Sequence, residues 1–96
     1  MSDTLTTAVA ALNEKLDGEG FDGTAKFVLE GDGSLMVDSS GARIADEDAD
    51  VTLTAEPETF QQIFDGELNP TNAFMAGKLT IDGDMGAAMR LATLLG

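Results

Sequence analysis

Apolar and polar residues follow two different periods along this chain, and each change of period marks a new structural element. After Ser2-Asp3-Thr4 the apolar positions recur at spacings of four, three and four, which predicts an amphipathic helix that these residues open and that ends at Gly18. From residue 22 to residue 30 apolar residues alternate with polar ones, which predicts a half-buried strand. The apolar residues concerned are Leu5, Val9, Leu12 and Leu16 in the first segment and Ala25, Phe27 and Leu29 in the second.

Turn residues divide the middle of the chain into three more short strands, over residues 34–38, 43–45 and 50–54. Because the turns between these four strands are closely spaced, the pattern predicts an antiparallel meander. A helix then begins at Pro57 and ends at Gly66, since Pro suits the first helical turn and Gly takes the left-handed conformation that closes a helix.

Three short elements follow with almost no residues between them. Asn69-Pro70 supplies a cap and a first helical residue for a short helix that ends at Gly77. Residues 78–82 alternate between polar and apolar, which predicts a fifth strand that joins the sheet by a crossover connection. Asp84 is suited to cap a final helix.

These elements predict an α/β (α+β) fold with a five-stranded, mostly antiparallel sheet and helices packed on one face. The length of 96 residues allows one core, so a single domain is expected over residues 1–96.

The C-terminal third contains the residues Gly66-x-Leu68-Asn69-Pro70, Ala73-Phe74, Gly77-Lys78-Leu79-x-Ile81-x-Gly83-x-Met85 and Ala88-Met89-x-Leu91. Their order and spacing resemble those of the sterol-carrier-protein type-2 domain family. The resemblance implies a lipid-binding domain whose helices enclose an apolar tunnel and which has no catalysis of its own. Many members have Gln where this chain has Ala76, which implies that a polar contact inside the tunnel is missing here.

The charge is strongly negative and unevenly distributed. The chain has 18 acidic and 5 basic residues, for a net charge of −13, and only Lys78, Arg90, Asp82 and Asp84 are charged after residue 67. Without a basic patch, nucleic acid is not expected as a partner. Anionic membranes should repel the protein, so no stable membrane insertion is expected.

Two motifs with a known chemistry fit poorly. Residues 18–23 match the G-x-G-x-x-G pattern, but a helix precedes them and a strand follows, which is the reverse of a dinucleotide site. Asp46, Asp48 and Asp50 resemble the start of a calcium loop, but Val51 and Pro57 occupy the positions that need Gly and Glu. We therefore expect two loops and no metal site.

Catalytic residue types are scarce. The chain has no His, Cys or Tyr, and its carboxylates show no spacing that marks a general acid or base. We expect no enzyme activity, no catalytic residues and no cofactor, although an enzyme that uses carboxylates alone stays open as an alternative.

The bulky apolar residues of the last three helices are the remaining candidates for function. Such residues usually form core, but the final helix is apolar nearly all round and therefore needs cover on more than one side. Together with the resemblance, this favours a lipid-lined cavity. The predicted ligand-binding residues are Phe27, Leu35, Phe60, Ile63, Phe64, Phe74, Met75, Met85 and Met89.

The resulting hypothesis is a non-catalytic lipid-binding or lipid-transfer protein whose ligand is a fatty acid, a fatty acyl-CoA or a sterol- or isoprenoid-like molecule. The alternative is a protein-interaction or dimerisation module that uses the apolar C-terminal helix. A monomer or weak dimer is expected. The absence of cysteine and of an N-terminal secretion signal favours a cytoplasmic location.

Overall fold

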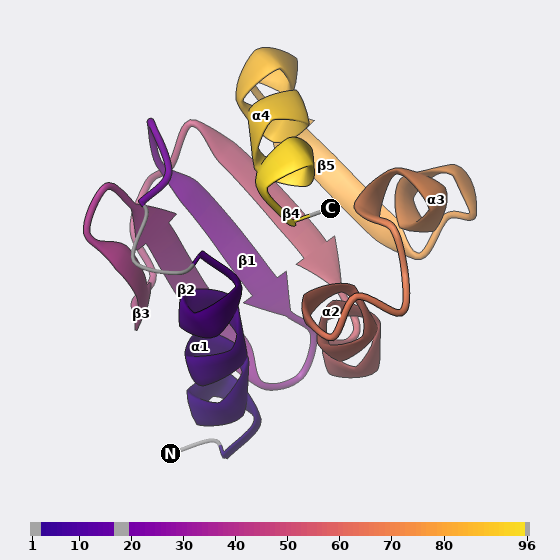
Figure 1. Ribbon diagram of the computed structural model, residues 1–96, viewed down its shortest axis with the longest axis horizontal. Helices are drawn as coiled ribbons and strands as arrows, with labels where there is room; N and C mark the ends of the chain where they lie inside the picture. Colours follow the sequence, from indigo (N-terminus) through magenta and orange to yellow (C-terminus); the bar gives the residue numbers. More distant parts are fainter. Residues whose placement is uncertain (1–2, 17–19, 96) are drawn as a thin grey trace.

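The computed structural model describes residues 3–16 and 20–95, and within them it confirms the predicted fold class. Helices α1, α2 and α4 lie over one face of a five-stranded sheet, and α3 lies beside the β5 edge (Figure 1). Gly18, where the first helix was expected to end, is outside the described residues. In chain order the elements are α1 (Asp3–Leu16), β1 (Ala25–Leu29), β2 (Gly33–Asp38), β3 (Gly41–Ile44), β4 (Val51–Ala55), α2 (Pro57–Phe64), α3 (Pro70–Met75), β5 (Leu79–Gly83) and α4 (Met85–Leu95).

The order of strands in the sheet is β3-β2-β1-β4-β5, and this corrects two predictions about connectivity. Only β1, β2 and β3 form an antiparallel meander, because β4 pairs in parallel with β1 instead of continuing from β3. The crossover therefore precedes β4, since a parallel neighbour cannot be reached by a hairpin. Strand β5 simply pairs antiparallel with β4 at the other edge.

The connection from β3 to β4, residues 45–50, passes over the face of the sheet that the helices leave open. Ser34 Oγ donates a hydrogen bond to the Ala45 carbonyl at 3.1 Å, and Lys26 Nζ lies 3.0 Å from Asp46 Oδ1. Ser34 and Lys26 alternate with residues that face the helices, so both contacts are on the opposite face. Met36 shares that face and is only 2% exposed.

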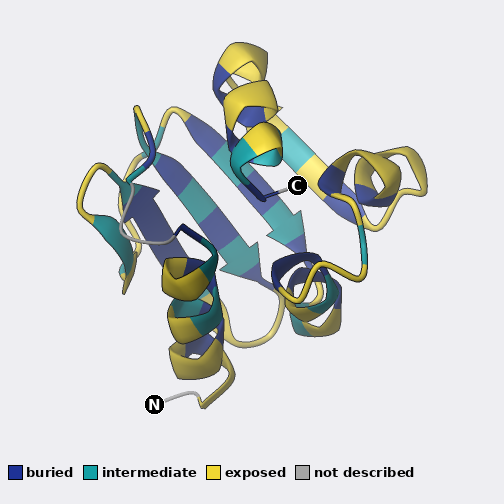
Figure 2. Cartoon of the chain, viewed as in Figure 1, coloured by how far each residue is buried: buried dark blue, intermediate teal, exposed yellow. Residues whose placement is uncertain are grey.

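The main core lies between the sheet and the helices. Figure 2 shows the alternation of buried and partly buried residues along β1 and β4 that results from burial of one sheet face. Phe27 of β1 contacts Phe60 and Phe64 of α2, with ring centroids 5.3 and 5.8 Å apart. These three rings fill the space between α2 and the centre of the sheet.

Candidate functional site

An apolar groove of approximately 220 Å³ lies between α3 and α4. Its floor comes from β4 and β5, and its two walls come from the two helices. Ten of its eleven lining residues are apolar, and the exception is Thr71. The lining residues are Leu53, Leu79 and Ile81 on the floor, Pro70, Thr71 and Phe74 on α3, and Met85, Ala88, Met89, Ala92 and Leu95 on α4.

Local hydrogen bonds fix the position of α3. Asn69 Oδ1 accepts from the Thr71 backbone N–H at 2.8 Å, which is the predicted N-cap, and Pro70 follows as the first helical residue. At the other end, Gly77 has a φ of +78°, and Lys78 N–H donates to the Ala73 carbonyl at 2.9 Å. These bonds confine α3 to six residues, which lead directly into β5.

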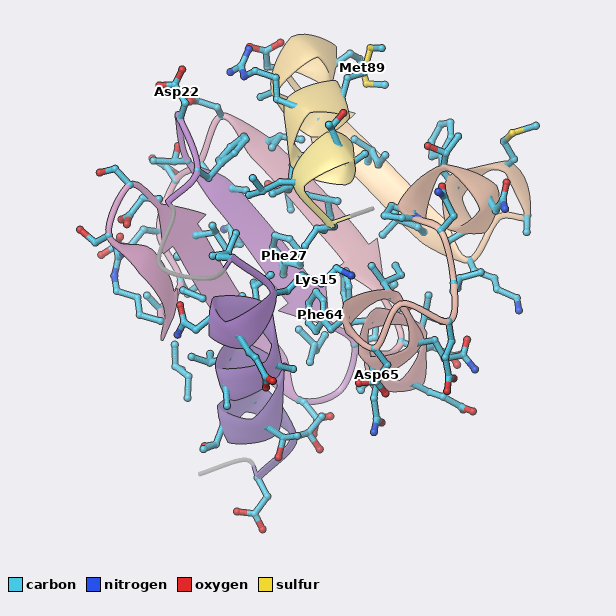
Figure 3. All side chains as sticks on the ribbon, viewed as in Figure 1. Lys15, Asp22, Phe27, Phe64, Asp65 and Met89 are labelled. Atoms are coloured by element: carbon cyan, nitrogen blue, oxygen red, sulfur yellow. The ribbon has the colours of Figure 1, made fainter. Side chains whose placement is uncertain are left out.

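Helix α4 is fixed at its start and along its side. Asp84 Oδ1 accepts from the Gly86 N–H at 2.9 Å, as expected of an N-cap. The Arg90 guanidinium lies 6.0 Å from the centre of the Phe21 ring and donates to the Asp22 carbonyl at 3.3 Å. In Figure 3, Asp22 and Met89 lie on opposite sides of α4, so Arg90 holds the helix from the side away from the groove.

The structure divides the nine predicted ligand-binding residues between the core and the α3–α4 surface. Phe27, Leu35, Phe60, Ile63 and Phe64 are buried in the core. Phe74, Met85 and Met89 line the groove, with exposed fractions of 44%, 51% and 70%. Met75 is 78% exposed and is not one of the groove-lining residues.

Sequence reasoning did not select most of the groove. The floor residues Leu53, Leu79 and Ile81 lie in the predicted strands at 50–54 and 78–82 but were not selected as ligand-binding residues. Ala88, Ala92 and Leu95 were not selected because small or ordinary apolar residues carry no functional signal of their own. A usable signal was the recurrence of 85, 88, 92 and 95 at spacings of three, four and three, which places them on one side of a helix.

Within the described residues the protein itself buries one side of α4, and the cover expected on a second side stays a prediction. Its Ala87, Ala88, Leu91 and Leu95 are buried, whereas Met85 and Met89 are exposed. The sheet therefore covers one side only, and the methionines form an apolar rim to the groove.

A second hollow, of approximately 290 Å³, lies between α1 and α2. Its lining includes Phe64, but also the polar side chains of Asp3, Thr7, Gln61 and Asp65. Figure 3 shows Phe64 pointing inward toward Phe27, while Asp65 lies at the surface. The mixture of carboxylate, hydroxyl and amide groups makes this hollow less suited to an apolar ligand than the α3–α4 groove.

The other candidate positions lie away from the groove. Ala76 is exposed at the C-cap of α3 and is not one of the groove-lining residues, so the Gln found there in many members would not enter the groove from this backbone position. In the 18–23 motif, Gly18 and Glu19 lie outside the described residues, and β1 follows the motif. Among the described residues, no acidic group of three or more has the arrangement of a metal site.

Among the carboxyls of residues 3–16 and 20–95, only Asp38 on β2 has a clearly shifted pKa, and it is remote from the groove. The backbone N–H of Ser40 and the Arg43 guanidinium both donate hydrogen bonds to Asp38, and they lower the pKa of Asp38 from its ordinary value of 3.8. The same two hydrogen bonds to the ionised carboxylate stabilise the β2–β3 turn. The shift does not create a general acid, since a lowered pKa keeps the carboxylate ionised.

No helix in residues 3–16 or 20–95 combines the length and the apolar character that crossing a bilayer requires.

Comparisons with known proteins agree on one family. The model of the SCP-2 sterol transfer family matches residues 4–96. Hydroxysteroid dehydrogenase-like protein 2 of Bos taurus is 35% identical over 100 residues, covering 99% of this chain and 22% of its own length. Sterol carrier protein 2 of Homo sapiens is 40% identical over 67 residues, covering 70% of this chain and 11% of its own length. This chain therefore spans only a small part of these relatives.

Solved structures show the same fold. The solution structure of sterol carrier protein-2 from Aedes aegypti, in complex with the C16 fatty acid palmitate, has a TM-score of 0.77 at 20% identity. The alignment covers 100% of this chain and 97% of that one. The match of the family model over nearly the whole chain, the relatives above 30% identity and this shared fold lead to one conclusion: the chain belongs to the SCP-2 sterol transfer family.

Proposed function

We propose that this protein binds a lipid in the α3–α4 groove and carries it without catalysing a reaction. The observation that supports this most directly is the lining of the groove, in which Thr71 is the one polar residue among eleven. Each methylene that leaves water for such a surface contributes about 0.8 kcal/mol, so a long chain can bind with few polar contacts. The palmitate in the mosquito relative is consistent with this mode of binding.

The candidate ligands are a fatty acid, a fatty acyl-CoA or a sterol- or isoprenoid-like molecule. In this proposal, Phe74, Met85 and Met89 contact the ligand directly. Methionine suits such a rim because its flexible side chain adapts to ligands of different shape. The core residues Phe27 and Phe60 would then support the sheet beneath the groove, and the expected tunnel would form where α3 and α4 close over a bound chain.

A groove-filling substitution tests the site. Ala92 is half-buried in the groove wall, so Ala92→Trp should occupy the hollow and weaken binding of the uncharged dye Nile red by at least about tenfold. Ala10→Trp is the matched control, because Ala10 is exposed on α1. Fluorescence titration measures the affinity, and circular dichroism verifies that both variants fold. Equal binding by the parent and by folded Ala92→Trp would rule out this groove.

A second candidate function is an interaction or dimerisation module that uses the apolar C-terminal helix α4, here extended by the adjacent helix α3. It is favoured by the exposure of Met75, which lies outside the groove and has no role in the lipid proposal. If this face joins two subunits, sedimentation analysis should show a dimer that dissociates in Met75→Glu while Nile red binding persists. A parent protein that is monomeric at high concentration would exclude dimerisation.

We also propose a cytoplasmic location, supported by the absence of cysteine from the sequence. Cell fractionation with an antibody to the protein would test it, and recovery from an organelle or from the medium would contradict it.

A further inference from the structure

The groove has a polar end. An open hollow adjoins the groove. It shares Thr71, Met89 and Ala92 with the groove lining and adds Asn69 and Thr93. Because three residues line both hollows, the apolar groove opens directly onto this polar region. A ligand with an apolar chain in the groove would therefore place its head group among Asn69, Thr71 and Thr93.

The polar groups at this end are neutral and can both donate and accept. Thr71 Oγ1 has no hydrogen-bond partner within the described part of the chain. Thr93 Oγ1 donates to the Met89 carbonyl at 3.1 Å and keeps its capacity to accept. Asn69 uses Oδ1 to accept from Thr71 N–H, which leaves its amino group as a donor. A hydroxyl group matches this combination, since it also donates and accepts.

No cation is directed at this end of the groove within the described residues. Arg90 is on α4, but its guanidinium contacts Phe21 and the Asp22 carbonyl on the other side of the helix. Lys78 lies in a different hollow, beside Glu30, Glu56 and Glu58.

The remaining basic side chains are on other elements, and the backbone offers an anion little. Lys15 extends its Nζ from α1 toward Gly66 and lines neither the groove nor its polar end, while Lys26 and Arg43 pair with acidic residues. The start of α3 presents few free amides, because Pro70 has no N–H and that of Thr71 is bonded to Asn69.

We propose that the groove selects long-chain lipids whose head group is an uncharged hydroxyl over lipids that carry a carboxylate or phosphate. This proposal rests on the lipid-binding function and narrows it. A carboxylate can only accept hydrogen bonds, and none of the described basic side chains lines this exposed end of the groove to pair with it. It would also enter a protein whose net charge is already −13. An alcohol of equal chain length has the same apolar gain and none of these costs.

The first test compares decanol with decanoate as competitors for bound Nile red at neutral pH. The two ligands have equal chain length, so the ratio of their affinities isolates the head group. We expect decanol to bind at least about tenfold more tightly, a difference of about 1.4 kcal/mol. Equal or tighter binding of decanoate overturns the head-group proposal and leaves the lipid function intact. Displacement by neither ligand overturns the lipid function, and this proposal with it.

The second test supplies the missing cation. Thr71→Lys places an ammonium at the polar end, and we expect it to strengthen decanoate binding about tenfold through a charge-assisted hydrogen bond. Thr80→Lys is the matched control, because Thr80 is exposed between the floor residues Leu79 and Ile81 and faces the opposite side of the sheet. It makes the same change in net charge and should alter decanoate binding less than about twofold. Equal effects of the two variants would show that net charge, and not the head-group position, controls selectivity.

Discussion

Met89 and Leu91 are two apolar residues of the same helix with opposite surroundings. Met89 is 70% exposed at the rim of the groove, whereas Leu91 is 0% exposed between α4 and the sheet. Their positions, two residues apart, are on different sides of the helix, so hydrophobicity alone does not tell them apart. We therefore expect Leu91, and not Met89, to contribute strongly to the stability of the folded state.

Truncation of each residue should show this difference. Met89→Ala should change the free energy of unfolding by no more than about 0.5 kcal/mol, because it removes little buried surface. Leu91→Ala should lower it by about 2–5 kcal/mol through the cavity that it leaves. Urea denaturation of the two variants measures both values. A cost for Met89→Ala as large as that for Leu91→Ala would mean that Met89 is packed in the core.

Asp38 gives a prediction about pH. The Ser40 N–H and Arg43 lower the pKa of Asp38 in the folded protein. The Asp38 carboxylate therefore binds a proton less readily in the folded state than in the unfolded state. The stabilisation is therefore complete above the unfolded pKa, near 3.8, and is lost as the pH falls through the lower folded value. Arg43 stays charged throughout this range.

Asp38→Asn isolates this contribution, because the amide can still accept from Ser40 but carries no charge to titrate. The melting temperature of the parent should fall toward that of the variant as the pH is lowered from about 6 to about 2. A constant difference between the two proteins across this range would show that the Asp38 charge does not contribute. Because the ion pair is at the surface, the difference should be small and should shrink with added salt.

Helix α4 depends on its first turn. Asp84 Oδ1 accepts from the N–H groups of Gly86 and Ala87, at 2.9 and 3.4 Å. Asp84→Ala should cost about 0.5–2 kcal/mol of unfolding free energy and weaken ligand binding, since Met85 lies in the turn that would fray. Asp84→Asn keeps the acceptor and should recover most of the stability. Urea denaturation and Nile red titration check both, and equal behaviour of Ala and Asn would rule out the capping role.

The boundaries of most elements could be predicted because local residues determine them. Asn69-Pro70 starts α3, and the glycines at 66 and 77 have φ values of +81° and +78° that end α2 and α3. Strand pairing could not be predicted in the same way. The alternation of Val51 and Leu53 is the same whether β4 pairs with β3 or with β1, and the contacts that distinguish the two pairings join residues distant in sequence, such as Ala25 and Val51.

The candidate site was predictable only in part for a related reason. Periodicity shows which residues share a helix face, but it does not show whether a sheet covers that face. Phe60 and Phe64 are covered by β1 through Phe27, while Met85 and Met89 are exposed at the rim of the groove. Helices α2 and α4 both carry bulky apolar residues at helical spacing. The core residues of α2 and the groove residues of α4 were therefore predicted as one set of ligand-binding residues.

The charge of the whole molecule determines how it meets a membrane. With a net charge of −13, the protein should bind anionic vesicles weakly at low salt, and binding should increase as salt screens the repulsion. Vesicles with uncharged surfaces serve as the control and should show little salt dependence. Co-sedimentation measures both. Tight binding to anionic vesicles at low salt that weakens with added salt would contradict the repulsion.

Because β4 pairs with β1 and not with β3, which precedes it in the sequence, the chain must close a long loop before β4 joins the sheet. Ala25 pairs with Val51 and Leu29 with Ala55, each 26 positions apart, whereas Leu29 and Gly33 in the neighbouring hairpin are only 4 apart. Long loops cost entropy before their contacts form, so we expect the β1–β2–β3 meander to form early and β4 late. The groove floor at Leu53 then forms after the folding transition state, and a bound lipid should slow unfolding while leaving the folding rate nearly unchanged.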